Sequence, residues 1–320
     1  MLESKTMTQA DGNHAFASPL TIDHAAHFVP DIDGASAALE NLGFTLTPFS
    51  AQLVRPENGG PPVSAGTGNR CVMLQRGYLE FLAPTHDTPN ASQLRAAMRR
   101  YTGIHLIAFG SDDGAADHAR LLQAGLEPLP VIALQRDVGA ESGTGTARFT
   151  VVRVPPGAMA EGRIQYCQHH TPELVWQPRW INHRNGVTGL AGLIVCAADV
   201  EEAAQRYARF TGLPVQGAGN ARRLETARGT LYVVTARILS ERLDIAAPAV
   251  PWIAGAVLES NDFALTAQTM RRSGITTRLL SEPSKNCMLV ELPAALGGIM
   301  IVQREGGDEA QKLFSLDKSL

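Results

Sequence analysis

Two side chains in strand-like stretches have the chemistry to hold a ligand or a metal ion. Glu80 lies inside an otherwise apolar run, residues 78–82, where burial of an unpaired carboxylate would be costly. A metal ion, or a hydroxyl group of a bound ligand, would offset that cost. His24 lies in a second strand-like run, residues 20–29, in which alternation places it on the face opposite His27. These two residues are therefore the first candidates for a functional site.

Both residues also have an ordinary structural interpretation. A single histidine on a strand is more often hydrogen-bonded within the fold than bound to a metal. Glu80 could pair with Arg70 or Arg148 in a polar cavity instead of holding an ion. That second arrangement is typical of a protein that binds a ligand without a metal.

The elements that would carry these residues occur four times along the chain. Each repeat has a segment that starts with Asp, continues with Ala and Leu at helical spacing, and reaches Gly 12 or 13 residues later: residues 31–43, 113–125, 199–212 and 262–274. Asp accepts the free N–H groups of a first helical turn, and Gly suits the left-handed position that follows a helix. The pattern predicts four short helices of matched length.

Strand-like runs flank these helices in a repeating order. One run precedes each helix, at residues 20–29, 104–110, 191–197 and 253–259. Further runs follow the first two helices, at residues 45–49, 70–75, 78–82, 129–135, 148–154 and 163–168, and the last repeat ends in residues 299–303. The sequence therefore predicts a βαβββ unit, four times over.

A chain of such modules resembles the vicinal oxygen chelate superfamily, and within it the glyoxalase-like branch. The likeness rests on the opening Ile22-Asp23-His24, on residues 77–82 at the end of the first module, and on residues 66–74 before them, and it spans about residues 20–303. It implies an α+β fold in which four βαβββ modules form two incomplete barrels, each built by two modules around a cavity. Glyoxalases, bleomycin-resistance proteins and extradiol dioxygenases share this fold, so the reaction has to be argued from the site.

The resemblance also implies where a metal would bind, because the superfamily takes its ligands from the first and last strands of each paired module. His24 and Glu80 stand at these positions in module one. In module two the last-strand position holds Gln165, a neutral amide that binds a divalent ion less firmly. The first-strand position holds Leu106, and His105 is one residue out of phase, so it faces the other way unless a β-bulge intervenes.

Modules three and four have no His, Asp or Glu at the corresponding positions. We therefore expect no metal in the second half, which serves as a structural partner or binds an apolar molecule. This also disfavours extradiol dioxygenase chemistry, since the relatives with that activity hold their iron in the second half.

The first functional hypothesis is a metal-dependent lyase or isomerase of the glyoxalase type. A divalent ion (Fe, Mn, Ni or Zn) on His24, Glu80, Gln165 and His105 would bind two neighbouring oxygens of a small substrate and stabilise an enolate. Glu80 would transfer the proton.

The alternative is a metal-free protein that binds or sequesters a small molecule, as bleomycin-resistance proteins do. Its cavity would hold the ligand by apolar walls and a few polar groups, among them Glu80, Asn69, Arg70 and Gln165.

Composition excludes several other classes. The chain of 320 residues has 44% hydrophobic and 18% charged residues, which is ordinary globular usage, and its net charge of -3 leaves no basic surplus for nucleic acid or an anionic membrane. The four cysteines are far apart, and no stretch of eighteen apolar residues occurs. We expect a cytoplasmic protein with a small-molecule ligand, and the sequence leaves open whether the modules pair within one chain or across a homodimer.

The same patterns predict a division of the chain. Tails are expected at residues 1–18 and 305–320, a glyoxalase-like domain at 19–166, an interdomain strap at 167–189 and a second glyoxalase-like domain at 190–304. Residues 50–69, rich in Gly and Pro, are interpreted as a lid over the cavity or a surface loop. His169 and His170 in the strap point to opposite sides of an extended chain, so they cannot both bind one ion.

Overall fold

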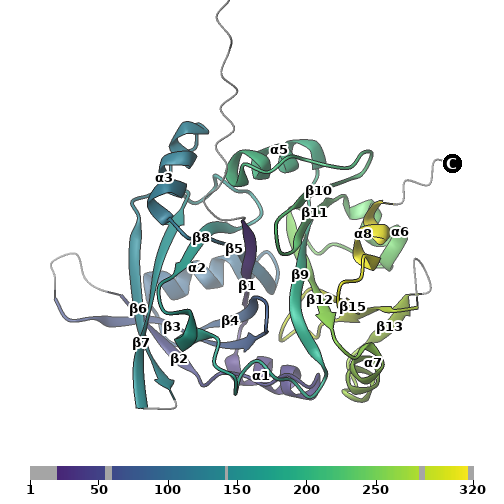
Figure 1. The fold of residues 1–320 in the computed structure, drawn as a ribbon, viewed down its shortest axis with the longest axis horizontal. Coiled ribbons are helices and arrows are strands. Elements are labelled where there is room, and N and C mark those ends of the chain that lie inside the picture. Colours follow the sequence, from purple (N-terminus) through teal and green to yellow (C-terminus); the bar gives the residue numbers. More distant parts are fainter. Residues whose placement is uncertain (1–19, 55–59, 141–142, 281–284, 316–320) are drawn as a thin grey trace, which may run out of the picture.

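The computed structural model describes residues 20–54, 60–140, 143–280 and 285–315 as two curved sheets side by side, with helices on their outer faces and at their ends (Figure 1). It has the α+β fold expected from the sequence. The helices are α1 Ile32–Asn41, α2 Pro89–Met98, α3 Gly114–Gln123, α4 Pro172–Val175, α5 Val200–Thr211, α6 Ala236–Leu243, α7 Phe263–Arg272 and α8 Glu309–Ser315.

The four repeated helices are α1, α3, α5 and α7, and their ends confirm the sequence pattern. The four preceding aspartates (Asp31, Asp113, Asp199 and Asp262) each accept backbone N–H groups of the first turn. The four glycines that follow the helices all have positive φ, between 73° and 92°. Because only glycine adopts this conformation without strain, the Asp and Gly together set the length of each helix.

Strands β1 to β8 form the first barrel, in the order β2-β3-β4-β1-β5-β8-β7-β6. Their bounds are β1 Thr21–Phe28, β2 Ser50–Val54, β3 Val63–Met73, β4 Tyr78–Pro84, β5 Gly103–Gly110, β6 Ile132–Ala140, β7 Gly143–Arg153 and β8 Arg163–His169. The first strands of the two modules, β1 and β5, pair antiparallel at the centre, so modules one and two pair within the chain.

Strands β9 to β15 form the second barrel, in the order β10-β11-β9-β12-β15-β14-β13. Their bounds are β9 Val187–Cys196, β10 Ala221–Glu225, β11 Thr230–Val234, β12 Trp252–Ser260, β13 Thr277–Leu280, β14 Cys287–Glu291 and β15 Ile299–Arg304. A single bridge, Ile253 to Ile104, joins β12 to β5 and links the two barrels. The largest hydrophobic cluster contains residues of both barrels and fills the space between them.

The first strand of every module has an extra, bulged residue eight positions before the aspartate that starts the following helix. The pairing of β1 with β5 skips Asp23 and His105, and the pairing of β9 with β12 skips Ala191 and Ala254 at these positions. A further irregularity, at Thr188 near the start of β9, does not belong to this pattern. From the sequence, His105 was expected to face away from the family position unless a β-bulge intervened. That bulge is present, and it is a feature of the repeat.

Several expectations from the sequence differ from the structure. Residues 45–49, expected as a strand, form a connection without regular structure that leads into β2. Module three has two strands after its helix, and the missing one is reduced to the bridge Gln216 to Arg223, because the connecting segment is short and turns at Gly217 and Gly219. Residues 50–54 and 63–69 belong to the β2–β3 hairpin, whereas a lid or loop was expected; residues 55–59 lie outside the described part. The expected boundary at 166/167 falls inside β8.

A helix packs against the apolar interior of each barrel. Leu94 of α2 packs into the apolar interior of the first barrel, and α6 does the same in the second. We expected residues 305–320 to pack little, but α8 inserts Ala310, Leu313 and Phe314 into the second barrel because their spacing forms one apolar helical face. The N-terminal tail lies outside the described residues.

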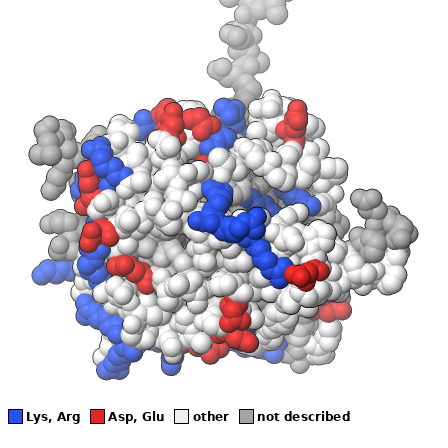
Figure 2. Space-filling model, turned by 180° about the vertical axis from the view of Figure 1, so that it is seen from behind, with Lys and Arg blue, Asp and Glu red and all other residues white. Residues whose placement is uncertain are grey.

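Surface charge and helix length add two observations. Lys and Arg side chains form a band across the face that carries α2, with a carboxylate at one end of the band (Figure 2).

Among the described helices, none is both long and apolar enough to cross a membrane.

Removal of the Phe314 side chain should destabilise the protein. Phe314 is 5% exposed and its ring lies 5.1 Å from that of Tyr232, so Phe314→Ala leaves a cavity in the second barrel. We expect a loss of about 3 kcal/mol in the free energy of unfolding, measured in urea. Leu265→Ala on α7, 40% exposed, is the control and should cost less than about 1 kcal/mol. Equal effects of the two changes would show that α8 does not pack as described.

His27 is buried on the outer face of β1, where it stacks on Phe81 with ring centroids 4.7 Å apart. Burial, together with the nearby His105, lowers the pKa of His27 to about 3. The unfolded chain therefore binds a proton at His27 near pH 6.5 whereas the folded chain does not. Stability should fall as pH decreases below this value.

Replacement of His27 should remove this pH dependence. In His27→Gln, the slope of the unfolding free energy against pH should be smaller by about 1.4 kcal/mol per pH unit between about pH 6 and pH 4. Urea unfolding at several pH values measures the slope. His86→Gln changes an exposed histidine and should leave the slope unchanged; an unchanged slope in His27→Gln would mean that His27 is protonated in the fold.

Candidate metal centre and barrel interior

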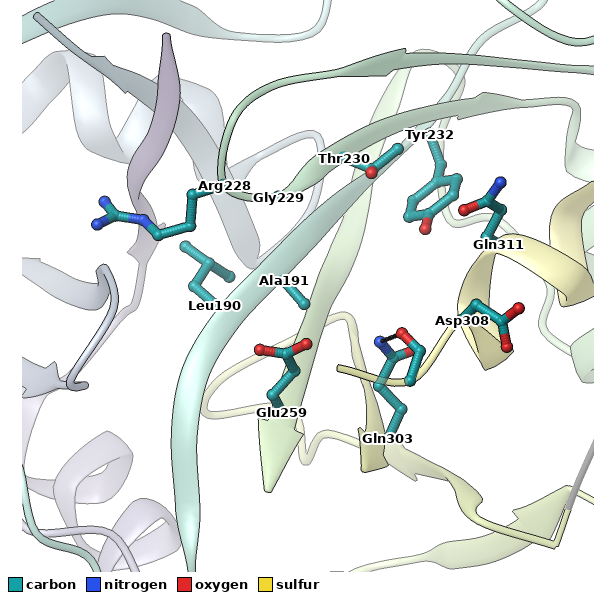
Figure 3. A pocket seen from close by; sticks show the side chains of 11 residues that line it. Leu190, Ala191, Arg228, Gly229, Thr230, Tyr232, Glu259, Gln303, Asp308 and Gln311 are labelled. Atoms are coloured by element: carbon teal, nitrogen blue, oxygen red, sulfur yellow. Dashed lines mark hydrogen bonds between the residues drawn. The ribbon is translucent and has the colours of Figure 1, made fainter. Parts of the chain in front are cut away.

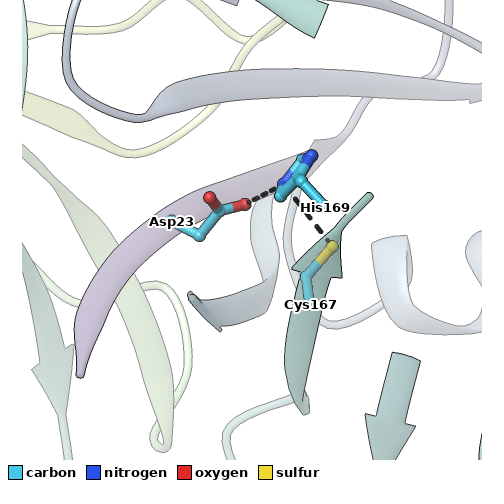
Figure 4. A group of neighbouring side chains, drawn as sticks. All are labelled: Asp23, Cys167 and His169. Atoms are coloured by element: carbon cyan, nitrogen blue, oxygen red, sulfur yellow. Dashed lines mark hydrogen bonds and ion pairs between the residues drawn. The ribbon is translucent and has the colours of Figure 1, made fainter. Parts of the chain in front are cut away.

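Asp23, Cys167 and His169 bring three possible metal-binding atoms together inside the first barrel (Figure 4). Nε2 of His169 donates to Oδ2 of Asp23 at 3.0 Å, and Sγ of Cys167 lies 3.7 Å from the same nitrogen. Asp23 and Cys167 are buried, and the side chain of His169 is 9% exposed. The three residues thus form a compact group just below the surface, which we call the donor cluster.

Two strands position the donor cluster. Asp23 is the bulged residue of β1, so its side chain and that of His24 both reach the barrel interior. On β8, Ile164 and Tyr166 belong to the outer hydrophobic core, so Cys167 and His169 point inward with alternate residues of the strand.

Aromatic rings hold His169 in place. Its ring packs edge-on against three others, at centroid distances of 5.1 Å from Phe149, 4.8 Å from Trp176 and 6.3 Å from Tyr78. Its Nδ1 is buried and has no hydrogen-bond partner among the residues that the structure describes. Trp176 belongs to the expected strap, which therefore packs against the first barrel beside the donor cluster.

The pKa values of the two acidic groups are shifted in opposite directions, although burial by itself raises both. Burial alone would raise the pKa of Asp23, but hydrogen bonds and charge from His169 and His24 outweigh it and hold the pKa well below its usual value. Burial raises the pKa of Cys167 well above its usual value, and the nearby carboxylates of Asp23 and Glu80 add to this. Without a cation, the centre therefore holds a carboxylate and a neutral thiol.

The spacing of the donor atoms fits a small divalent ion. In a tetrahedral site with metal–nitrogen and metal–oxygen distances of about 2.0–2.1 Å and metal–sulfur distances of about 2.3 Å, neighbouring donors lie roughly 3.3–3.6 Å apart. The observed 3.0 Å and 3.7 Å differ from these values by a few tenths of an ångström. A carboxylate, an imidazole and a thiol are ligands that Zn²⁺ and similar ions accept.

His24, the first-strand candidate, lies at the edge of this cluster. Its Nδ1 donates to Oδ2 of Asp23 at 2.6 Å, and its ring stacks on Tyr78 at a centroid distance of 4.3 Å. His24 faces the interior as alternation predicted, and it orients Asp23.

Glu80 lies deeper in the barrel, between Tyr78 and Leu82 on the inner face of β4. One of its carboxylate oxygens accepts a hydrogen bond from the side-chain amide of Asn69. Asn69, one of the polar residues expected to line a ligand cavity, is thus the residue that orients the Glu80 carboxylate.

Arg70 does not pair with Glu80. Its Nε donates to the carbonyl of Thr47 at 2.9 Å and its Nη1 lies 3.8 Å from Glu40, on the outer side of the sheet. Arg148, the other expected partner, is exposed. Both fail to reach Glu80 because alternation turns them outward.

Gln165 and His105 have different surroundings. Gln165 is buried on the inner face of β8, opposite Ala108 of β5 and Arg153 of β7. Nε2 of His105 donates to the carbonyl of Tyr101 at 2.8 Å, and burial lowers the pKa of His105 to about 4.

The structure therefore divides the four candidate ligands. His24 belongs to the edge of the donor cluster, and Glu80 and Gln165 lie on inner strand faces. His105 stacks on Phe28 and Tyr101 and lies near His27, so within the described chain it joins neither group.

The sequence reading overlooked the donor cluster itself. Asp23 was passed over because alternation turns it away from the face of His24, and the bulge that reverses this is a property of strand pairing. His169 was assigned to a strap because β8 was expected to end at residue 168. A usable signal was the spacing of eight residues between Asp23 and Asp31, which recurs from His105 to Asp113.

A separate cavity of about 260 Å³ lies in the second barrel, beside α8 (Figure 3). Its walls are polar, but they bind one another: the Gln303 amide donates to the Gly307 carbonyl at 2.7 Å and accepts from the Ala310 N–H at 3.0 Å. Glu259 pairs with Arg76 at 3.1 Å. No group of three metal-binding side chains lies there among the residues that the structure describes.

Solved structures share the fold over most of the chain. A hypothetical protein from Staphylococcus aureus is similar with a TM-score of 0.62 and 10% identity, covering 89% of this chain and 99% of its own. A 4-hydroxymandelate synthase mutant from Streptomyces coelicolor gives 0.51 and 16%, covering 93% and 97%. A fusion of a xylose isomerase-like TIM barrel with a 4-hydroxyphenylpyruvate dioxygenase gives 0.58 and 12%, covering 95% and 53%. Such identities show the fold alone.

Among curated proteins, none matched the sequence. A family model described as a glyoxalase-like domain matches residues 22–211, which is more than half of the chain and includes β1, Glu80, the whole of β8 and the strap. The repeated modules, the central pairing of β1 with β5 and this match agree. The chain therefore belongs to the glyoxalase-like domain family, within the vicinal oxygen chelate superfamily.

Proposed function

We propose that this protein is a metal-dependent enzyme of the glyoxalase-like type, with its active site inside the first barrel. The observation that supports this best is the donor cluster, in which Asp23, Cys167 and His169 present three ligand atoms at distances suited to a divalent ion. A bound ion would act as a Lewis acid on neighbouring oxygens of a small substrate, which is the lyase or isomerase chemistry implied by the family.

The residues of the chain have separate roles in this proposal. His24 holds the Asp23 carboxylate in position through its 2.6 Å hydrogen bond. Trp176 and Phe149 pack around His169 and exclude water from it. Glu80 carries the proton, because it has a carboxylate on the inner face and a single amide donor, Asn69, to orient it.

We assign the site to the domain at residues 19–166 together with the end of β8. The second domain, residues 190–304, has a supporting role: the turn before β11 places Arg228 against β1, with Ile22 N–H donating to the Arg228 carbonyl at 3.0 Å. The charge of Asp23 acts on the Arg228 guanidinium, whose pKa burial lowers.

A metal-free binding protein is the second candidate. It is favoured by one observation: two of the four positions that carry ligands in the family hold Leu106 and Gln165, so the usual ligand set is incomplete. The two candidates differ in whether the donor cluster takes up an ion.

Metal binding tests the proposal. After removal of bound ions with a chelator, we expect the protein to bind one equivalent of Zn²⁺, Mn²⁺, Ni²⁺ or Fe²⁺ in calorimetric titrations. Asp23→Asn and His169→Gln should each weaken binding by about 10- to 100-fold or more, because each removes one of three ligands. Turnover of 2-oxoaldehydes and catechol-like compounds would then be screened with the loaded protein.

Two comparisons locate the ion. His170→Gln changes the neighbouring exposed histidine, whose Nε2 lies 2.8 Å from Oγ1 of Thr150 and outside the donor cluster, and it should not alter affinity. Glu80→Gln should also leave affinity within a few-fold of the wild type. Loss of binding in Glu80→Gln but not in His169→Gln would move the ion to the family positions, and absence of binding in the wild type would leave the metal-free candidate.

A further inference from the structure

Three arginines extend into the first barrel from neighbouring strands. Arg136 of β6 is paired with Ala147, which lies in the inner hydrophobic cluster. Arg153 of β7 and Arg163 of β8 stand on the inner faces of their strands, since Val152 and Ile164 next to them belong to the outer core. We call Arg136, Arg153 and Arg163 the arginine cluster.

The arginine cluster surrounds Glu80. Arg163 is in the same row of the sheet as Glu80, through Ala26 of β1 and Leu106 of β5. On the other side, Cys71 is the register partner of Glu80, and the guanidinium of Arg136 acts on that thiol. Arg153 lies opposite Gln165, two residues along β8 from Arg163.

These guanidinium groups lack the carboxylate partners that buried arginines normally have. Within the described chain, the Nε atoms of Arg136 and Arg153 are buried without a hydrogen-bond partner, and none of the three side chains forms an ion pair. Arg136 lies instead over the ring of Phe149, 5.7 Å from its centroid. Arg206 shows the usual arrangement, with Glu161 at 2.8 Å and Glu202 at 2.9 Å. Glu80 can offset one of the three charges, and Asp23, which two histidines hold in the donor cluster, is a second carboxylate of the barrel. The interior as a whole therefore keeps an excess of about one positive charge.

Such an excess is costly in a folded protein unless something binds to it. Burial and the charge of Arg153 lower the pKa of Arg163, which shows that the two groups repel each other in a poorly hydrated place. Guanidinium groups bind planar carboxylates through two parallel hydrogen bonds, and they do so best where water is excluded.

We propose that the arginine cluster is a binding site for a small organic acid with two negative charges, held by Arg153 and Arg163 at one end and by Arg136 at the other. This rests on the proposed function in placing the substrate in the first barrel, and it adds the substrate class, a dicarboxylate. The basic band across the face that carries α2, a helix that packs onto this interior through Leu94, would attract such an anion (Figure 2).

Binding of simple anions to the metal-free protein tests this directly. The probes are malonate, succinate and glutarate, with succinamide as the uncharged match and inorganic phosphate as the other source of a dianion. We expect calorimetry to show one site for a dicarboxylate, with phosphate weaker by at least about tenfold because it cannot span both ends of the cluster. Arg153→Gln and Arg163→Gln should each weaken dicarboxylate binding by about tenfold or more.

A matched control lies on the same strand as Arg153. Arg148→Gln removes the same charge from the exposed face of β7 and should leave affinity unchanged. Thermal unfolding gives a second measurement: the dicarboxylate should raise the Tm of the wild type but not of Arg163→Gln. Without ligand, Arg163→Gln should unfold at the same or a higher temperature than the wild type, because it removes a repelled charge, so lost binding can be separated from failure to fold.

Several results would overturn the inference. Equal binding of succinamide would mean that charge is not recognised, and equal loss in Arg148→Gln would mean that net charge alone attracts the anion. Tighter binding of phosphate would replace the dicarboxylate by a phosphate site. These titrations contain no metal, so the two proposals can fail separately. If the protein takes up a metal ion but binds no anion, the dicarboxylate site is rejected and the proposed enzyme is not. If it binds the anion but takes up no metal ion, the proposed enzyme is rejected and a binding protein for organic acids remains.

Discussion

The antiparallel pairing of β1 with β5, with one extra residue in each strand, is the constraint on which the first barrel depends. A regular pair would alternate inward and outward residues without interruption, so Asp23 would turn away from His24. The bulge lets both side chains enter the barrel, and their 2.6 Å contact fixes the carboxylate that His169 approaches from β8. The same bulge recurs in β9 and β12, where Ala191 and Ala254 carry no ligand atoms. The repeat thus places a bulged residue at the same point of all four modules. In the described chain, the bulged residues of the first barrel have side chains that can bind a ligand, and those of the second barrel are alanines.

Charge is distributed unevenly inside that barrel. Asp23, the one strongly ionised acid of the donor cluster, is held by two histidines, whereas Arg163 shares the strand row of Glu80 and Arg153 lies opposite Gln165. Arg136 lies next to both groups, because its guanidinium is over the ring of Phe149, which His169 also contacts, and it acts on Cys71 beside Glu80. A cation and an anionic substrate could therefore bind at neighbouring places without competing for the same groups. This arrangement differs from one in which Glu80 is itself a ligand, since an ion there would have guanidinium groups as neighbours. The second barrel contrasts with the first, because α8 fills part of its interior and the polar residues that line its cavity bind one another.

The helix termini and the repeat could be predicted because they depend on local chemistry. An aspartate that caps a first turn and a glycine with positive φ act within a few residues of themselves, so they are visible in any one segment. The inward position of Glu80 beside Asn69 was likewise accessible, because alternation along β3 and β4 is strict there. The β2–β3 hairpin could not be predicted. Its glycines indicated a loop, but in the structure Gly68 lies within a strand and allows the ring of Phe49 to approach the backbone closely.

The sequence by itself determined the four repeated helices, the family and the inward positions of His24 and Glu80, because each follows from periodicity or from short-range hydrogen bonds. Only the tertiary structure decided which side chains meet. Asp23 and His169 are 146 positions apart, and their contact requires a bulge whose position is set by the pairing of two strands from different modules. The three arginines likewise come from three strands, and their lack of carboxylate partners is a property of the assembled barrel. Long-range pairing of this kind leaves no periodic trace along the chain, which is why the barrel and not the sequence shows where a cation and an anion could bind.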